Sequence, residues 1–252
     1  MALLATAASS ACKPPETTPP QPVRTIKLEV VVAPSLFETV LEETKNFKRR
    51  LTAIDVELVV GDSAQVVEQI RKGRPIDVLI MDDPHRTALL IAEGVIDPAE
   101  LRPLAGDDVL LVVPNNSTIM SARNDDLPDP RLQNMVMPNP ETTGSGRIIK
   151  EALEREGIWE TLAPRMTFTD GVRIALELAM RGEVDAAIVG SADRALAGDM
   201  VRDLRRFAVE ERYIEIAPSR RSAHPEAARA YATWLASEAF KVALSHKGFI
   251  VD

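Results

Sequence analysis

The chain has 252 residues, of which 45% are hydrophobic and 27% are charged, and its 38 acidic and 30 basic residues give a net charge of −8. This composition is typical of a globular protein with room for one large domain or two modest ones. The acidic balance and the lack of a basic block argue against nucleic-acid binding, and the sequence has no run of 18 apolar residues that would span a membrane.

The first 24 residues have the composition of a targeting segment rather than of a folded domain. Residues 2–11 are small and mostly apolar, Cys12 is the only cysteine, and residues 13–24 contain five prolines. This arrangement resembles a bacterial lipoprotein signal with Cys12 as the lipid attachment site, although no basic segment comes first and Ser9 stands where that pattern usually has Leu. The alternative is an ordinary cleaved signal. We therefore predict a signal or lipoprotein-like segment at 1–12 and a Pro-rich tether at 13–24.

From Thr25 onward, short apolar runs typical of strands alternate with amphipathic segments typical of helices. The alternation predicts parallel sheets with right-handed crossovers. We expect the segment 115–134, which is rich in Asn, Asp and Pro, to be mainly loop. The predicted strands are 26–33, 54–60, 77–80, 108–114, 134–137, 166–169, 185–189 and 211–217, and the predicted helices are 35–51, 63–72, 84–93, 145–156, 171–181, 225–236 and 238–246.

The predicted elements form two similar α/β halves, joined by strand-like segments near 109–114 and 211–217. We therefore expect a two-lobed α/β fold in which each lobe is a mostly parallel sheet flanked by helices. Residues 25–108 plus 215–252 are assigned to one lobe and residues 109–214 to the other. Because ligands of open α/β sheets bind beyond the carboxyl ends of the strands, we expect a ligand cleft between the lobes.

Four of the predicted helices begin shortly after a strand, at or near Ser35, Ser63, Ser145 and Val172. The start of a helix has unpaired N–H groups and the positive end of the helix dipole, so four such starts facing one cleft predict a site for a small anion. Each serine taken alone is equally well explained as an ordinary helix cap. Only the set of four therefore points to a ligand.

Six segments match, in order and spacing, the periplasmic molybdate-binding proteins of ABC uptake systems, and the chain resembles this family over about residues 27–249. The segments are APSLFETV, GDSAQVVEQIRKGRPIDVLI, DDPHRTALLIAEGVID, NPETTGSGRIIKEALEREGIWETLAPRM, GVRIALELAMRGEVDAAIVGSAD and PEAARAYATWLASEAFKVALSHKGF. The resemblance implies a type II periplasmic-binding-protein fold and a tetrahedral oxyanion ligand, molybdate or tungstate. It also implies delivery to an ABC permease in the inner membrane by a monomeric periplasmic or cell-surface protein, without enzyme activity or a cofactor.

The resemblance implies that Ser35 and Ser63 bind the ligand through hydroxyl and N–H groups, and that Ser145 and Val172 donate backbone N–H groups. These four residues would then hold the molybdate oxygens. A site made only of donors suits a fully ionised dianion, which only accepts hydrogen bonds. Gly190 stands where the family commonly has a tyrosine, so one donor is missing.

Asp62 stands where the family usually has a small or hydroxyl residue, directly before Ser63. If its carboxylate faces the ligand, it would repel a dianion but accept a proton from a monohydrogen phosphate or arsenate. Its alternative role is that of a solvent-facing helix cap, and the same interpretation applies to Asp82 and Asp83. Asp62 is therefore a candidate selectivity residue.

Two other functions remain open at this point. One is binding of another oxyanion or of a small organic anion. The other is hydrolysis, because Gly61-Asp62-Ser63 resembles the nucleophile block of GDS-type esterases and an Asp-x-x-His follows at Asp82 and His85, although that second block lies near the C-terminus in those enzymes. The three histidines, at 85, 224 and 246, do not have the spacing of metal ligands.

Overall fold

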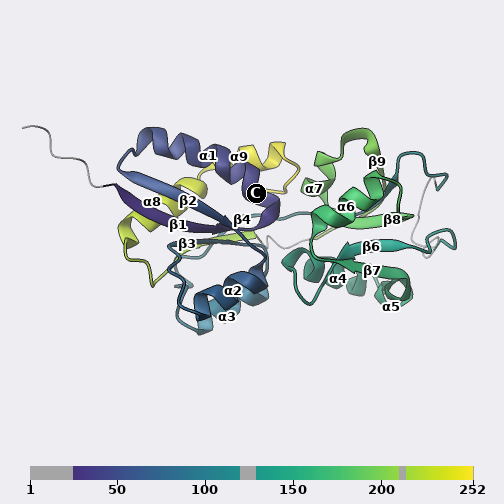
Figure 1. The fold of residues 1–252 in the computed structure, drawn as a ribbon, viewed down its shortest axis with the longest axis horizontal. Coiled ribbons are helices and arrows are strands. Elements are labelled where there is room, and N and C mark those ends of the chain that lie inside the picture. The colour runs from purple at the N-terminus through teal and green to yellow at the C-terminus, as the bar shows by residue number, and fades with distance from the viewer. Residues whose placement is uncertain (1–24, 120–128, 210–213, 252) are drawn as a thin grey trace, which may run out of the picture.

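The computed structural model describes residues 25–119, 129–209 and 214–251, and these form two lobes that lie side by side (Figure 1). Each lobe contains one five-stranded sheet with helices on both faces. The two-lobed α/β fold expected from the sequence is confirmed. The predicted signal-like segment with Cys12 and the Pro-rich tether lie outside the described residues.

The first lobe holds a sheet with the strand order β2-β1-β3-β10-β4. Its strands are β1 (Ile26–Val32), β2 (Ile54–Val60), β3 (Val78–Met81), β4 (Arg102–Ala105) and β10 (Ile214–Pro218). A 3₁₀ turn (Pro34–Leu36) leads into α1 (Phe37–Arg50), and the other helices are α2 (Ser63–Arg71), α3 (Pro84–Ala92), α8 (Pro225–Leu235) and α9 (Glu238–His246).

The second lobe holds a sheet with the strand order β7-β6-β8-β5-β9. Its strands are β5 (Val109–Pro114), β6 (Met135–Pro138), β7 (Met166–Thr169), β8 (Ala186–Gly190) and β9 (Val201–Phe207). Its helices are α4 (Gly144–Arg155), α5 (Trp159–Leu162), α6 (Val172–Met180) and α7 (Ser191–Leu196), with 3₁₀ turns at Ala163–Arg165 and Gly198–Met200.

Both sheets are mixed, and they repeat one pattern. In the first sheet, β1 pairs in parallel with β2 and β3, whereas β10 runs antiparallel to β3 and β4. In the second, β6 pairs in parallel with β7 and β8, whereas β5 runs antiparallel to β8 and β9. The segments 109–114 and 211–217 were expected to join the lobes, but β5 lies within the second sheet and β10 within the first. The chain crosses from the first lobe to the second just before β5.

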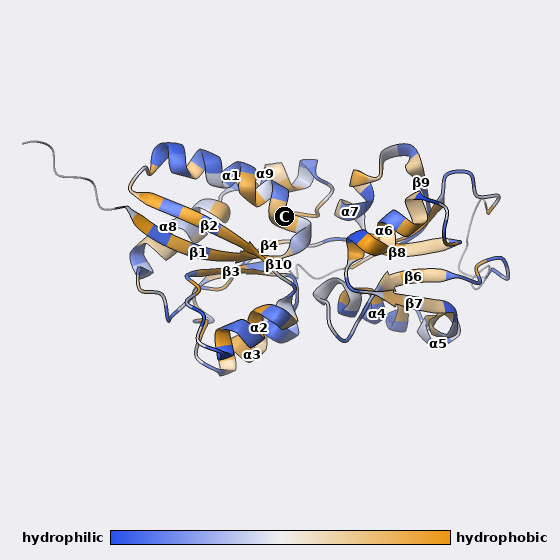
Figure 2. Ribbon diagram, viewed as in Figure 1, coloured by the Kyte–Doolittle hydropathy of each residue, from blue (hydrophilic) through white to orange (hydrophobic). Residues whose placement is uncertain are grey.

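The strands form the core because alternate residues are buried on opposite faces of each sheet. Along β5, Val109, Leu111 and Val113 join one buried cluster, and Leu110 and Val112 join another. The first of these clusters continues into the first lobe, so the lobes share one apolar core through the crossing strands. Burial on both faces of the sheet explains why the sequence has continuous apolar runs, which appear as the orange stretches of the strands in Figure 2.

The division of the chain into residues 25–108 plus 215–252 and residues 109–214 stays a prediction. Strands β4 and β9 were not predicted, because β4 contains Arg and Pro and β9 carries charged residues along an exposed edge. None of the helices in the described part of the chain is long and apolar enough to cross a membrane.

Candidate functional site

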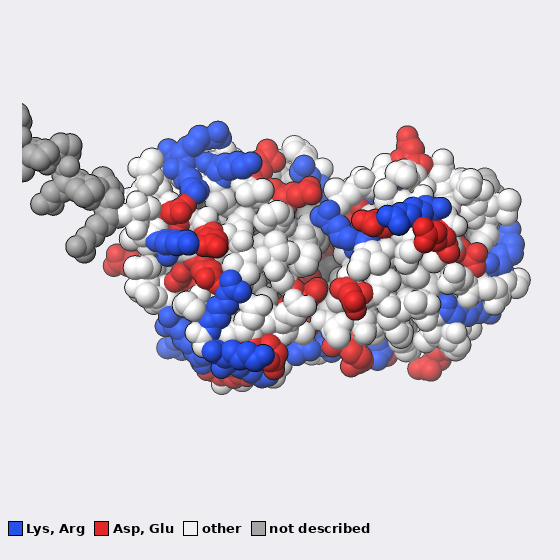
Figure 3. Space-filling view, in the orientation of Figure 1, with Lys and Arg blue, Asp and Glu red and all other residues white. Residues whose placement is uncertain are grey.

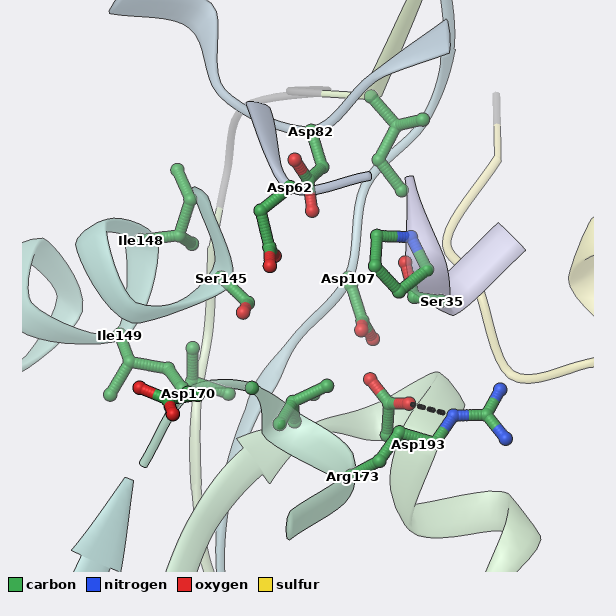
Figure 4. Close-up of a pocket in the computed structure, with 16 residues that line it drawn as sticks. Ser35, Asp62, Asp82, Asp107, Ser145, Ile148, Ile149, Asp170, Arg173 and Asp193 are labelled. Atoms are coloured by element: carbon green, nitrogen blue, oxygen red, sulfur yellow. Dashed lines mark ion pairs between the residues drawn. The ribbon is translucent and has the colours of Figure 1, made fainter. Parts of the chain in front are cut away.

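A cavity of about 190 Å³ lies where the two lobes meet, and residues of both lobes line it. The first lobe contributes Ser35 and Asp62, and the second contributes Ser145, Val172 and Gly190 (Figure 4). Five of the six residues that the sequence singles out for ligand binding or selectivity are therefore brought to one cavity. Charged side chains of both signs surround the hollow between the lobes (Figure 3).

The carboxyl ends of the strands place these residues. Ser35 lies in the turn that follows β1, Asp62 is the N-cap of α2 after β2, and Val172 is the first residue of α6 after β7. Parallel strands end at one edge of a sheet, so the residues that follow them gather there. This is the arrangement that the sequence predicted, in which helix starts of the two lobes face one cleft.

The start of α4 carries Ser145 close to the opposite lobe. Thr143 caps the helix, since its hydroxyl accepts a hydrogen bond from Gly146 N at 3.0 Å. A Cβ on Gly144 would lie 2.6 Å from Asp82 Oδ1, and a Cβ on Gly146 would lie 2.6 Å from the backbone of Asn139. Glycine is needed at these two positions for close approach, and the first of them lets the lobes meet.

Ser63 does not line the cavity. It is 2% exposed, and its hydroxyl donates a hydrogen bond to Asp82 Oδ1 at 2.6 Å. The side chain is thus occupied within the first lobe, whereas Ser35 and Ser145 border the cavity (Figure 4). The direct contact of Ser63 with a ligand stays a prediction.

Five aspartates line the cavity, and sequence reasoning singled out only one of them for this role. They are Asp62, Asp82, Asp107, Asp170 and Asp193. Among the described residues, the only basic side chain of the lining is that of Arg173, whose Nε lies 3.6 Å from Asp193 Oδ1. Four of the aspartates stand in short connections beside strand or helix ends, and Asp193 lies in the short helix α7. Three of them were overlooked because Asp is also a common cap and turn residue.

Asp82 and Asp83 were interpreted as solvent-facing caps, and the structure corrects this. Asp82 is 6% exposed and Asp83 is 2% exposed. Asp83 does cap α3, accepting from the N–H groups of His85 and Arg86, but its other oxygen lies 3.3 Å from Arg147 Nε of α4. Asp83 is therefore a buried link between the lobes, and Asp82 belongs to the cavity.

Burial disfavours ionisation of four of the carboxyl groups of the cavity, those of Asp62, Asp82, Asp107 and Asp193. It raises the pKa of Asp107 to about 7 and the pKa values of Asp82 and Asp193 to about 6. For Asp62, burial and then the charge of Asp170 raise the pKa. Two unit charges 4 Å apart interact by about 4 kcal/mol at an effective dielectric of about 20, so an ionised carboxylate strongly opposes a nearby anion. The charge of the cavity therefore depends on the protonation of these groups.

Asp107 occupies the space beside Gly190. Its Oδ1 accepts hydrogen bonds from the Ser191 hydroxyl and from Ala192 N, the latter at 3.0 Å. A Cβ built on Gly190 would overlap Asp107 Oδ2. The backbone of Gly190 has φ −73° and ψ 155°, which any residue adopts. Gly190 is therefore needed for space and not for its backbone conformation, and Asp107 borders the cavity on the side where the missing tyrosine was expected.

Contacts across the cleft hold the lobes together around the cavity. Besides the pair formed by Asp83 and Arg147, His85 Nε2 of α3 lies 3.1 Å from Glu151 Oε1 of α4. On another side, Arg173 NH1 lies 3.7 Å from Glu38 Oε1 of α1. The structure therefore has the two lobes in contact on more than one side of the cavity.

The geometry does not support the hydrolase alternative. Ser63 donates to Asp82, and His85 faces Glu151, so the serine has no histidine base beside it. Within residues 25–119, 129–209 and 214–251, no group of three or more His, Cys, Asp or Glu side chains is arranged to hold a metal ion. The described residues therefore fit a ligand cavity between two lobes better than a hydrolase site.

Comparison with known proteins agrees with this assignment. The family model described as "Bacterial extracellular solute-binding protein" matches residues 28–250. The chain belongs to this family. As an extracellular solute-binding protein it is a member of a transport-protein family and not of an enzyme class, which is the coarse form of the sequence-based expectation.

Individual relatives confirm the resemblance to molybdate-binding proteins. The chain is 31% identical over 188 residues to the molybdate-binding protein ModA of Escherichia coli, which covers 72% of this chain and 71% of that protein. The structure of the periplasmic molybdate-binding protein of Azotobacter vinelandii has a TM-score of 0.73 at 18% identity, covering 89% of this chain and 99% of that one.

The same fold also serves other ligands. A periplasmic thiamin-binding protein has a TM-score of 0.74 at 15% identity, covering 90% of this chain and 84% of that chain. Proteins named for ligands as different as molybdate and thiamin thus share this architecture. The ligand of this solute-binding protein must therefore be argued from the residues of its own cavity.

Proposed function

We propose that this extracellular solute-binding protein captures a tetrahedral oxyanion, molybdate or tungstate, between its two lobes and delivers it to an ABC permease. The observation that supports the proposal most directly is the meeting of Ser35, Ser145 and Val172 at one cavity between the lobes. Similarity to the molybdate-binding protein of Escherichia coli supports the same ligand.

The chemistry of these residues suits an oxyanion. Ser35 and Ser145 offer hydroxyl groups, and the first N–H groups of α4 and α6 have no partner inside their helices. Charge-assisted hydrogen bonds of this kind contribute about 1.5–3 kcal/mol each. The helix dipoles add a positive potential at the same points without placing a free cation in the site.

Delivery follows from the two-lobed architecture. An anion bound to donors of both lobes favours the conformation in which the lobes are in contact, because only that conformation makes all the bonds. The closed protein then presents residues of both lobes on one surface, and the permease recognises this surface as the ligand-bound conformation. We infer that one protomer is sufficient, since the resemblance to periplasmic binding proteins implies a monomer and both lobes of one chain contribute to the cavity.

Another oxyanion or a small organic anion is a second candidate, and the five aspartates favour it. A carboxylate at Asp62 or Asp82 accepts a proton that a monohydrogen phosphate or arsenate carries and that molybdate or sulfate lacks at neutral pH. We therefore keep the ligand class wider than molybdate, and treat selectivity as a question about these carboxyl groups.

The experiment that tests the proposal is calorimetric titration of the protein with molybdate, tungstate, sulfate, phosphate and arsenate in a buffer free of oxyanions, at about pH 6 and about pH 8. Tightest binding of molybdate or tungstate is expected. Tightest binding of phosphate or arsenate would select the second candidate, and heat from none of the five would overturn the oxyanion assignment.

We further propose that Cys12 anchors the protein at a membrane surface through a lipid. The segment lies outside the described residues, and the proposal rests on its resemblance to a lipoprotein signal. The full-length chain expressed in a Gram-negative host is expected to be recovered with membranes, and Cys12→Ala in the periplasmic fraction. Recovery of both proteins in the soluble fraction would remove the anchor and leave the binding function untouched.

A further inference from the structure

Asp107 lies in the segment where the chain first crosses from one lobe to the other, between β4 and β5. Its side chain is 4% exposed and lines the cavity. The neighbouring Gly106 is hydrogen-bonded in both directions to Ile250, so the crossing is held against the C-terminal segment. Asp107 is thus a fixed part of the cavity wall and not a side chain on a loose loop.

The two oxygens of Asp107 have different surroundings. Both hydrogen bonds that it accepts within the described residues, from the Ser191 hydroxyl and from Ala192 N, go to Oδ1. Oδ2 lies over Gly190, in space that exists only because this residue has no side chain. A proton on this carboxyl group is therefore carried by Oδ2, and the O–H group lies at the cavity.

The donors around Asp107 compensate its charge only in part. The Ser191 hydroxyl has one proton, and that hydroxyl also lies 2.9 Å from the carbonyl oxygen of Gly248. Two acceptors compete for one donor, so the Ser191 hydroxyl gives the ionised form of Asp107 less than one full hydrogen bond. Burial raises the pKa of Asp107 to about 7, and these bonds offset that effect only partly.

The charged groups that face Asp107 across the cavity are mostly acidic. They are Asp62 at the start of α2, Asp82 after β3, Asp170 and Arg173 at the start of α6, and Asp193 in α7. The carboxyl groups of Asp107 and Asp193 point toward each other (Figure 4). Arg173 is already near Asp193, and among the residues that the structure describes the lining holds no other basic side chain to neutralise Asp107. Within this part of the lining, a proton is the remaining means of neutralising the carboxylate.

We propose that Asp107 binds the ligand as a carboxylic acid, donating a hydrogen bond from Oδ2 to an oxyanion oxygen, so that the cleft takes up an oxyanion together with one proton. The inference rests on the proposed function. When the ligand is a dianion such as molybdate, the proton comes from solvent and protonates Asp107. When it is a monohydrogen anion, the ligand brings the proton and the total is the same. The ligand class is therefore an oxyanion. Its complex with the protein contains one proton in addition to the fully ionised oxyanion and the ionised Asp107 carboxylate.

The test is calorimetric titration with sodium molybdate at about pH 7 and about pH 9, in two oxyanion-free buffers of different ionisation enthalpy. With a pKa of about 7, half of Asp107 is protonated at the lower pH and about one hundredth at the higher, so the wild type is expected to bind about fifty-fold more weakly at pH 9. The buffer dependence of the heat is expected to give close to one proton taken up per molybdate at pH 9.

The variant Asp107→Asn separates this effect from other carboxyl groups, because its amide keeps the shape and donates from the same place without titrating. It is expected to bind at pH 9 with nearly its affinity at pH 7 and with proton uptake close to zero. The control is Asp199→Asn, an identical substitution at an exposed residue outside the cavity, which should behave as the wild type.

Four results would overturn the inference. Wild-type affinity that is the same at both pH values, with no proton uptake, would remove the role of Asp107 and leave the oxyanion function standing. Equal pH dependence in Asp107→Asn would assign the proton to another group. Affinity that rises with pH would mean that ionised carboxylates bind the ligand, as they would bind a cation. Failure of the wild type and of Asp107→Asn to bind any oxyanion at about pH 6 would overturn the proposed function as well.

Discussion

Arg147 of α4 reaches across the cleft to Asp83 of the first lobe, with its Nε 3.3 Å from a carboxylate that is only 2% exposed. The same carboxylate caps α3 through its other oxygen. One side chain thus fixes the start of a helix in one lobe and pairs with a cation of the other. Asp83 is buried in the closed arrangement, so the pair stabilises closure more than it stabilises either lobe.

Arg147→Ala is expected to weaken ligand binding by about 1–3 kcal/mol, because the buried Asp83 carboxylate then keeps only the more distant Arg86, whose Nε lies 3.8 Å away in the same lobe. Thermal unfolding of the ligand-free protein should change little. Calorimetry measures the first effect, and small-angle scattering should show a larger radius for the variant at the same ligand concentration.

The matched control is Arg181→Ala. Arg181 pairs with Glu177 one turn away on α6, where both side chains are more than half exposed, and pairs of this kind contribute little. Both affinity and radius should match the wild type. Equal losses of affinity in the two variants would show that Arg147 acts through general charge and not through closure.

The elements of the fold could be predicted where the apolar period is regular. Strands β2 and β7 and helix α9 span the predicted residues. Burial of one or both faces of such an element gives a regular pattern of apolar residues, which can be recognised in the sequence. Strand β9 carries four charged residues out of seven, and pairing with β5 alone makes it a strand. The pairing of β9 with β5 is a tertiary contact, and the local sequence pattern of β9 does not predict it.

The same distinction applies to the site. Ser35, Ser145 and Val172 could be predicted to meet because strand ends in an α/β sheet meet by topology. Asp107 and Asp193 could not, because one lies in a crossing between lobes and the other in a short helix of the second lobe. Their approach depends on how the crossing packs against α7, through the bonds from Ser191 and Ala192.

The two serines of the first lobe should respond differently to truncation. Ser35→Ala removes a hydroxyl from the cavity wall, so molybdate binding is expected to weaken by about 1.5–3 kcal/mol with little change in unfolding temperature. Ser63→Ala instead removes the donor of buried Asp82, and the free energy of unfolding at about pH 8 should fall by about 1–3 kcal/mol.

Titration and chemical denaturation of the two variants separate the effects. A loss of affinity in Ser63→Ala at least as large as in Ser35→Ala, without a loss of stability, would show that Ser63 contacts the ligand directly. The roles assigned by the present geometry would then be wrong, and the expectation from the family resemblance would be right.

The free energy of unfolding is expected to increase as the pH falls from about 8 to about 5.5. The pKa values of Asp82, Asp107 and Asp193 are raised from 3.8 to about 6, 7 and 6. Groups with raised pKa values favour the folded state at low pH, and this contribution is lost as pH rises through 6 and 7. The unfolding temperature of the ligand-free protein is therefore expected to rise by several degrees between about pH 8 and about pH 5.5.

Carboxyl groups with lowered pKa values do not oppose this within that window. Hydrogen bonds from basic side chains lower the pKa values of Asp55, Glu93 and Asp129, so their contribution is lost only below about pH 4. Differential scanning fluorimetry across the range measures the slope. Asp107→Asn should have a smaller slope than the wild type, and an unfolding temperature that falls as the pH is lowered from 8 to 5.5 would contradict the assignment.

Gly190 offers the sharpest test of how the cavity is built. A tyrosine there would restore the donor that the family resemblance leads one to expect, and the extended backbone at this position accepts any residue. The obstacle is Asp107 Oδ2, which occupies the space of the first side-chain carbon. Gly190→Tyr alone is therefore expected to destabilise the protein by about 1–3 kcal/mol and to bind molybdate no more tightly than the wild type.

Alanine isolates the steric part of this argument, because the cavity offers a matched glycine. A Cβ on Gly171 would have no atom within 4 Å, whereas a Cβ on Gly190 would meet Asp107. Gly171→Ala should leave the unfolding temperature within a degree or so of the wild type, and Gly190→Ala should lower it.

Combining Gly190→Tyr with Asp107→Ala should recover part of the stability that Gly190→Tyr alone loses. A double-mutant cycle should then give a favourable coupling of about 1–2 kcal/mol between the two positions. Because the tyrosine hydroxyl does not titrate near neutral pH, the double variant should also bind molybdate equally at pH 7 and pH 9. Additive destabilisation in the double variant would mean that the two side chains do not compete for one space.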